Sequence, residues 1–208
     1  MDRRLFLATG LLVGTAALTA NAQTAPPTRV RGTVAAVEGN TMTVNSRDGT
    51  KLEITLNDPV TVASVKKVEL SAIEPNSFIG TATRTGVDGK LTAIEVLVFP
   101  EAMRGTGEGF YPWDLEPGSM MTNGTVKGTV AAASGRDLTV SYKDKASGTD
   151  KSNTVYVPPA AAIVTFAPAE RADLKPGAPV FLIAAKNAEG KLTAARVTVG
   201  KDGVAPPM

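Results

Sequence analysis

The residues best suited to recognition lie together in one segment near the middle of the chain, residues 100–124, called the arm below. It holds Phe110, Tyr111 and the only tryptophan, Trp113, together with three of the six methionines. Tryptophan, tyrosine, methionine and arginine are enriched where proteins bind their partners. One interpretation is that the arm aromatics pack between two domains and fix their orientation, because large apolar side chains are usually buried. The other is that the arm lines a binding surface for a protein, peptide or glycan, with the candidate residues Arg104, Glu108, Phe110, Tyr111, Trp113 and Asp114. Both can hold at once.

The arm also offers a set of possible metal ligands. Met103, Met120 and Met121 carry thioethers, which are soft ligands that select Cu(I). This makes a metal-handling accessory role the alternative function. The sequence has no His and no Cys to complete such a site, and methionine fills cores equally well. We expect no cofactor.

The sequence contains few of the residue types that enzymes use for catalysis. Without His or Cys there is no Cys–His or Ser–His nucleophile and no typical zinc site. Four carboxylates in the arm could supply the acid and base of a glycosidase, but loop spacing does not set their separation in space; they are Glu101, Glu108, Asp114 and Glu116. We expect a protein that is not an enzyme.

The first residues have the composition of an export signal. Arg3 and Arg4 precede an apolar run from Leu5 to Leu18, and small residues follow up to Ala22. The paired arginines resemble a twin-arginine signal, and a plain Sec signal fits as well. We expect residues 1–22 to be a signal peptide, the mature chain to be periplasmic or secreted, and no transmembrane span to remain in it.

The charge balance argues against nucleic acid as a partner. Removing the signal takes away two Arg and one Asp and leaves 20 positive and 19 negative residues. A near-neutral chain offers no strong electrostatic attraction to DNA or RNA, and neither half has a basic groove with stacking aromatics.

The frame that must position the arm is an internal repeat. Residues 30–44 return as residues 126–140 with nine of the fifteen positions identical. A repeat of this period divides the chain into two small domains, residues 29–99 and 125–200, with the arm between them and a flexible tail at 201–208.

The sequence of each repeat indicates short strands joined by tight turns. Strict alternation of Leu52, Ile54 and Leu56 with polar residues indicates a half-buried strand. Turns are predicted at Gly39-Asn40, Asp48-Gly49, Asp88-Gly89 and Glu189-Gly190. A short helical turn ends at Pro75 and again at Pro176, and we expect Ile73 and Leu174 beside these prolines to plug the sheets. Five strands with a helical turn between the third and fourth match an OB-like barrel. The expected fold is all-β, two tandem five-stranded OB-like barrels joined by an ordered arm, with small sandwiches or split barrels as the alternative.

The repeated pattern also resembles a known family. Gly-Thr-Val-Ala-Ala, a later Thr-Val, and Gly-Lys-Leu-Thr-Ala before a Val-rich strand are similar to exported bacterial OB-like modules known as a domain of unknown function. The arm, with Pro100-Glu101, residues 104–109 and residues 112–115, resembles a proteobacterial subgroup often called metal transporter permease components. That label conflicts with a mature chain that has no apolar span. The resemblance implies no catalytic residue, and relatives often have His where Phe110 stands. We expect a non-enzymatic exported binding or structural protein.

Overall fold

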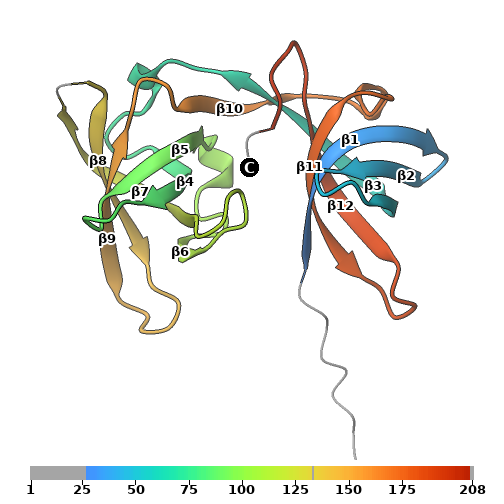
Figure 1. Cartoon of the computed structure of the whole chain (residues 1–208), viewed down its shortest axis with the longest axis horizontal. Coiled ribbons are helices and arrows are strands. Elements are labelled where there is room, and N and C mark those ends of the chain that lie inside the picture. The colour runs from blue at the N-terminus through green and yellow to red at the C-terminus, as the bar shows by residue number, and fades with distance from the viewer. Residues whose placement is uncertain (1–26, 133, 207–208) are drawn as a thin grey trace, which may run out of the picture.

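The computed structural model describes residues 27–132 and 134–206, and its fold is all-β (Figure 1). Twelve strands and three 3-10 turns make up the described part of the chain. The predicted signal peptide, residues 1–22, lies outside the described residues. Across residues 27–132 and 134–206, no helix has the length and apolarity needed to cross a membrane.

The first group of strands forms a closed barrel, called ring 1. Each strand pairs with the next around the ring, and the last pairs back with the first, in the order β1 (Thr28–Glu38), β2 (Thr41–Ser46), β3 (Lys51–Lys67), β12 (Leu192–Val199) and β11 (Pro179–Lys186). Met42, Val44, Ile54 and Leu56 alternate with exposed or half-buried polar residues and fill its core. The alternation predicted from the sequence therefore identifies residues whose side chains fill the interior of ring 1.

The remaining long strands form a second ring, called ring 2. Its order is β4 (Phe78–Thr85), β5 (Leu91–Val98), β9 (Asp150–Val157), β8 (Arg136–Lys143) and β7 (Met120–Ala131). The pairing of β5 with β9 that closes this ring is short, with two residue pairs, Leu91 with Val155 and Thr92 with Tyr156.

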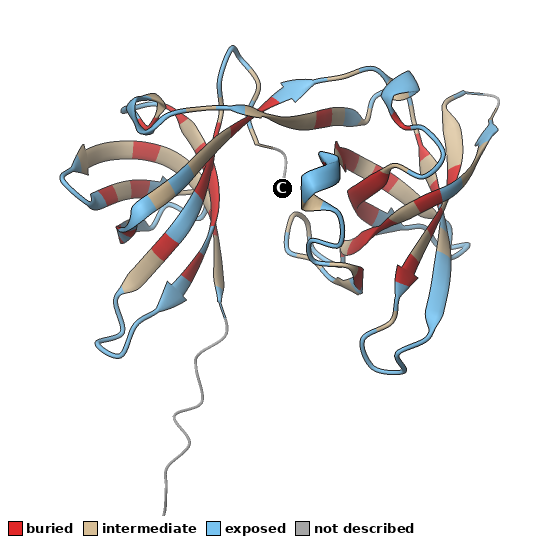
Figure 2. Ribbon diagram, turned by 180° about the vertical axis from the view of Figure 1, so that it is seen from behind, coloured by how far each residue is buried: buried red, intermediate tan, exposed pale blue. Residues whose placement is uncertain are grey.

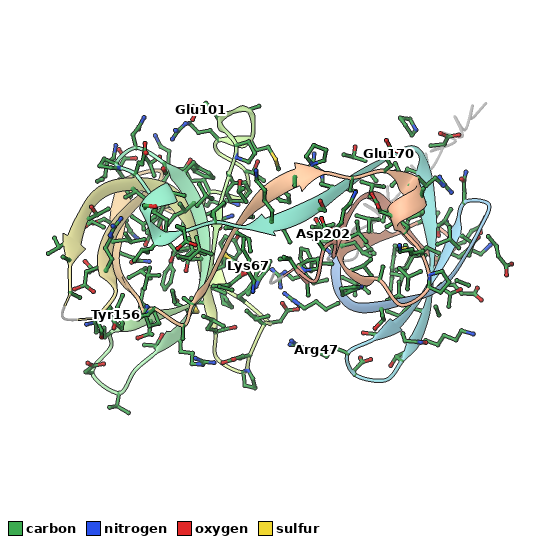
Figure 3. The ribbon with its side chains drawn as sticks, turned by 90° about the horizontal axis from the view of Figure 1, so that it is seen from above. Arg47, Lys67, Glu101, Tyr156, Glu170 and Asp202 are labelled. Atoms are coloured by element: carbon green, nitrogen blue, oxygen red, sulfur yellow. The ribbon has the colours of Figure 1, made fainter. Side chains whose placement is uncertain are left out.

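The tandem arrangement expected from the repeat is not confirmed, because each ring takes strands from both repeats. Ring 1 joins β1 to β3 of the first repeat to β11 and β12 of the second, while ring 2 joins β4 and β5 to β7, β8 and β9. The rings therefore do not follow the expected segments 29–99 and 125–200. The second half of β3 and strand β10 (Ala162–Pro168) run between the rings and pair antiparallel with each other, as Figures 1 and 3 show.

The length of β3 explains how the rings come to exchange strands between the two repeats. The sequence has no glycine between Gly49 and Gly80 that could fold the chain back sharply, and residues 60–65 are rich in β-branched side chains. A strand of 17 residues spans about 55 Å at 3.3 Å per residue, which is enough to leave one ring and reach the other. The chain enters ring 2 only after η1 (Leu70–Ala72).

In the first strand of the repeat, the alignment of the two copies in space differs from their alignment in sequence. The sequence match places Gly32 on Gly128, but in space Gly124 has the role of Gly32. Val34 and Val126 both lie buried and exchange equivalent backbone hydrogen bonds with the segment after the helical turn, whereas Val130 is 66% exposed. The hairpin of β7 and β8 is four residues longer than that of β1 and β2, and the sequence Gly-Thr-Val occurs twice in β7.

The predicted turns and plugs are confirmed. Gly39, Gly49, Gly89 and Gly190 all adopt positive φ at tight turns. The helical turns form η1 and η3 (Arg171–Asp173) before the two prolines. Ile73 and Leu174 are both buried. Ile73 plugs ring 2, although the first strands of its repeat lie in ring 1. Leu174 plugs ring 1, although the first strands of its repeat lie in ring 2.

A third apolar cluster lies outside both ring interiors. Phe78, Leu97 and Phe99 of ring 2 pack there with Val65 and Val164 of the two crossing strands. Figure 2 shows buried segments on the crossing strands as well as in both rings. Val204 packs on this cluster too, and Lys201 pairs with Val204, so residues 201–204 of the expected flexible tail are held in place.

Cutting the arm tests the strand exchange. A site for a specific protease inserted between Pro117 and Gly118, both exposed, divides the chain into β1–β6 and β7–β12. Because each ring needs strands from both fragments, we expect the cut fragments to elute together from a gel-filtration column and to separate only in denaturant. Elution of two folded fragments at their separate sizes without denaturant would show that the strands are not exchanged.

Candidate functional site

A pocket of about 320 Å³, lined mainly by apolar side chains, lies between the rings. Ring 1, ring 2, the arm and β10 all contribute to its lining. Five aromatic side chains form its walls, and they are Phe99, Tyr111, Trp113, Phe166 and Phe181. Its volume falls at the lower end of the range for small-molecule sites, about 300–1,000 Å³, and its aromatic lining is typical of them.

The arm reaches the pocket as an ordered segment. After Pro100 it forms η2 (Glu101–Met103) and β6 (Gly109–Pro112), which pairs with β7. The Trp113 amide donates to the Ser119 carbonyl over 2.8 Å, and the Ser119 hydroxyl donates to the Trp113 carbonyl over 3.1 Å. In Figure 1, β6 lies between the two rings.

Trp113 stands where the arm meets ring 1. Its ring lies 4.0 Å from the Arg29 guanidinium carbon and 6.4 Å from the Phe181 ring centroid, and Tyr111 packs on its edge at 6.0 Å. A guanidinium over the face of an indole is a favourable cation–π contact. The next residue, Asp114, forms an ion pair of 2.9 Å with Arg31. The tryptophan is thus fixed by contacts with both its own arm and ring 1.

The structure divides the predicted site in two. Tyr111 and Trp113 line the pocket, and Asp114 supports them through Arg31. The other three face ring 2: the Phe110 ring packs on Tyr142 with 37% of the residue exposed, Arg104 donates to the Asn76 carbonyl over 2.8 Å, and Glu108 accepts from the Lys143 amide over 3.1 Å. These three attach the arm to ring 2 and do not line the pocket.

The three methionines are not brought together. Met103 and Met121 line the pocket, whereas Met120 precedes Met121 on β7 and so points to the other face of the strand. The Arg196 guanidinium lies 4.0 Å from the Met103 sulfur, and a fixed cation there disfavours a metal ion. In the described part of the chain no three Asp or Glu residues gather as metal ligands. The metal hypothesis therefore gains no support from the geometry.

The arm carboxylates are each held by a separate group. Arg104 holds Glu101 at 2.6 Å and Arg84 holds Glu116 at 2.5 Å, and these hydrogen bonds lower the pKa of both carboxyls. The acid of a glycosidase needs the opposite shift, a raised pKa. The remaining two, Glu108 and Asp114, are bound to Lys143 and Arg31.

Most of the pocket lining was missed by sequence reasoning. Its unpredicted lining residues with charged or aromatic side chains are Arg29, Phe99, Phe166, Phe181 and Arg196. Arg29 precedes the buried Val30 on a strand, so the alternation places it on a solvent face. That outer face of ring 1 is covered by the arm, and no pattern within one strand indicates this.

A buried carboxyl group lies on the face of ring 2 that looks toward the arm. Glu95 of β5 is 1% exposed, and neither of its oxygens has a hydrogen-bond partner among the residues that the structure describes. Burial raises its pKa to about 8, and the nearby Arg31 charge opposes this only in part. Arg31 in turn has two buried nitrogens without partners. The boundary between the rings therefore holds polar groups that the structure leaves unsatisfied.

In comparisons with known proteins, no family model, no curated protein and no solved structure matches this chain.

Proposed function

We propose that the protein is a non-enzymatic binding protein that holds a small, largely apolar ligand in the pocket between its two rings. The observation that carries this proposal is the lining of five aromatic side chains drawn from four separate parts of the fold. These aromatics pack in two groups, Phe99 on Phe166 and Trp113 on both Tyr111 and Phe181, and the groups leave an open volume of about 320 Å³. Close-packed interiors have few voids larger than a water molecule, so an open volume of this size suits a ligand.

The setting proposed for this function is an exported, periplasmic or secreted protein with OB-like rings. Five strands in each ring and a 3-10 turn in each repeat support the OB-like assignment. The export signal and the family resemblance rest on the sequence alone. We do not extend the proposal to metal handling, because Met120 lies apart from the pocket that Met103 and Met121 share.

Dye binding tests the proposal. N-phenyl-1-naphthylamine, an uncharged aromatic dye, is titrated into the protein while energy transfer from Trp113, the only tryptophan, is followed. We expect saturable binding with one dye per chain. Trp113→Ala, followed by dye emission alone, should weaken binding at least tenfold because it removes one aromatic wall.

Phe110→Ala is the matched control, since Phe110 is an arm aromatic that packs on Tyr142 outside the pocket. It should leave the dissociation constant within twofold of the wild type. Phe166→Leu, on β10, tests a second wall without touching the arm. Absence of saturable binding, or equal losses from Trp113→Ala and Phe110→Ala, would contradict a site in this pocket.

A further inference from the structure

We infer that the ligand of this pocket is a small amphiphilic anion, with an apolar body among the aromatic walls and a carboxylate or sulfonate group bound by Arg29 and Arg196. This inference rests on the proposed function and names the ligand class of the same site. Its starting point is the charge of the lining: both formal charges in it are positive, and no Asp or Glu lines the described pocket.

Arg196 is the less compensated of the two cations. It lies on β12 as an exposed residue, and within the described chain its guanidinium has one hydrogen-bond partner, the Met103 sulfur at 4.0 Å. A thioether is a weak acceptor and carries no charge. None of the ion pairs of the described residues includes Arg196. Its guanidinium is therefore available to an anion.

Arg29 is compensated only in part. The one carboxylate of the described residues that pairs with it, Asp114, lies 3.8 Å away and is bound more closely by Arg31 at 2.9 Å. One carboxylate thus serves two arginines. The Trp113 ring, 4.0 Å from the Arg29 guanidinium carbon, orients that group without neutralising it. The pocket wall at β1 keeps a net positive charge.

This arrangement selects among ligand classes. Two arginines repel a metal ion or an organic cation, and the aromatic walls do not favour a small hydrated anion such as phosphate. A guanidinium donates paired hydrogen bonds to a carboxylate or sulfonate, and such bonds are stronger in a partly desolvated site than in water. A molecule with an apolar body and one anionic end satisfies both halves of the lining.

Two dyes with the same ring system separate the contributions. 1-Anilinonaphthalene-8-sulfonate carries a sulfonate, and N-phenyl-1-naphthylamine is its uncharged counterpart. We expect Arg196→Gln to weaken the sulfonate dye about tenfold and to leave the uncharged dye within twofold. Because Arg29 also packs on the Trp113 wall, Arg29→Gln should weaken both dyes, and the sulfonate dye more than the uncharged one. Arg196→Lys should restore part of the affinity, and raising KCl from 50 to 500 mM should weaken the sulfonate dye alone.

Arg84→Gln is the matched control, because Arg84 pairs with Glu116 outside the pocket and its loss changes the net charge equally. If both dyes bind and the pocket arginines affect them equally, the anionic ligand class is refuted while the binding function stands. If neither dye binds, the proposed function fails first. Arg196 is exposed, so loss of folding does not obscure its variant, and thermal unfolding of Arg29→Gln checks the other.

Discussion

The wild-type protein is expected to lose free energy of unfolding on the order of 4 kcal/mol as the pH rises from 4.5 to 8, through one carboxyl group, at 1.36 kcal/mol per pKa unit. The group is Glu95, whose pKa rises from 4.5 to about 8 because it is buried without a hydrogen-bond partner. Below pH 4.5 both folded and unfolded chains hold the proton. Between the two pKa values the unfolded chain releases it while the folded chain keeps it, so stability falls. Above pH 8 both are ionised and the loss is complete.

Glu95→Gln tests this, because an amide does not titrate in that range. Urea unfolding at pH 5, 6.5 and 8 should show a steep fall for the wild type and a much flatter profile for the variant. The variant keeps an unpaired buried polar group, so the pH dependence is the measurement, not the stability at one pH. Glu53→Gln, at an exposed position of β3, is the matched control and should keep the wild-type slope. An unchanged slope in Glu95→Gln would show that water reaches the carboxylate.

Gly124→Ala is expected to destabilise the fold by about 3 kcal/mol, at the upper end of the cost of overpacking. A Cβ at Gly124 would overlap the Ser141 carbonyl oxygen of the paired strand β8 and lie 3.0 Å from a Val140 methyl carbon. Neither neighbour can move without opening the β7–β8 ladder. For a chain of this size the thermal midpoint should fall by roughly 6–12 °C.

Gly128→Ala is the control, because the sequence alignment alone would give Gly128 the role that Gly124 has in the structure. A Cβ at Gly128 meets no atom within 4 Å, and its φ is not positive, so alanine there should leave the midpoint within about 2 °C. Calorimetry of both variants beside the wild type decides the register of the repeat. Equal effects at the two positions would restore the alignment of Gly32 with Gly128.

The sequence was a good guide to local structure because turns and alternation depend on near neighbours. Gly39, Gly49 and Gly89 mark real turns, and the alternation of Ile54 with Leu56 gives a real core face. The path between rings could not be predicted in this way. A strand such as β3 has the same residue pattern whether the chain turns back into the same ring or crosses to the other one. Only pairing with distant strands decides which of these paths the chain takes.

Only a small part of the site could be predicted, for the same reason. Tyr111 and Trp113 could be found from composition, since large aromatics are rare in this chain. Glu95 could not, because β5 carries it between Ile94 and Val96 in a pattern that places it on a solvent face. That face is instead covered, so both faces of β5 are buried around this point. Covering by another part of the chain leaves no local signal in the residue that is covered.

The exchange of strands sets the order in which the protein can fold. Ring 1 closes only when β1 finds β11, which pairs Thr28 with Ala184, and β3 finds β12 near the end of the chain. Contacts this distant in sequence make folding slow, because long loops must be ordered before any pairing rewards them. Until β11 and β12 have left the ribosome, β1, β2 and β3 have no partners with which to close ring 1, and both edges of any sheet that they form stay unpaired in that ring. The nascent chain therefore stays susceptible to aggregation longer than two consecutive barrels of the same composition would.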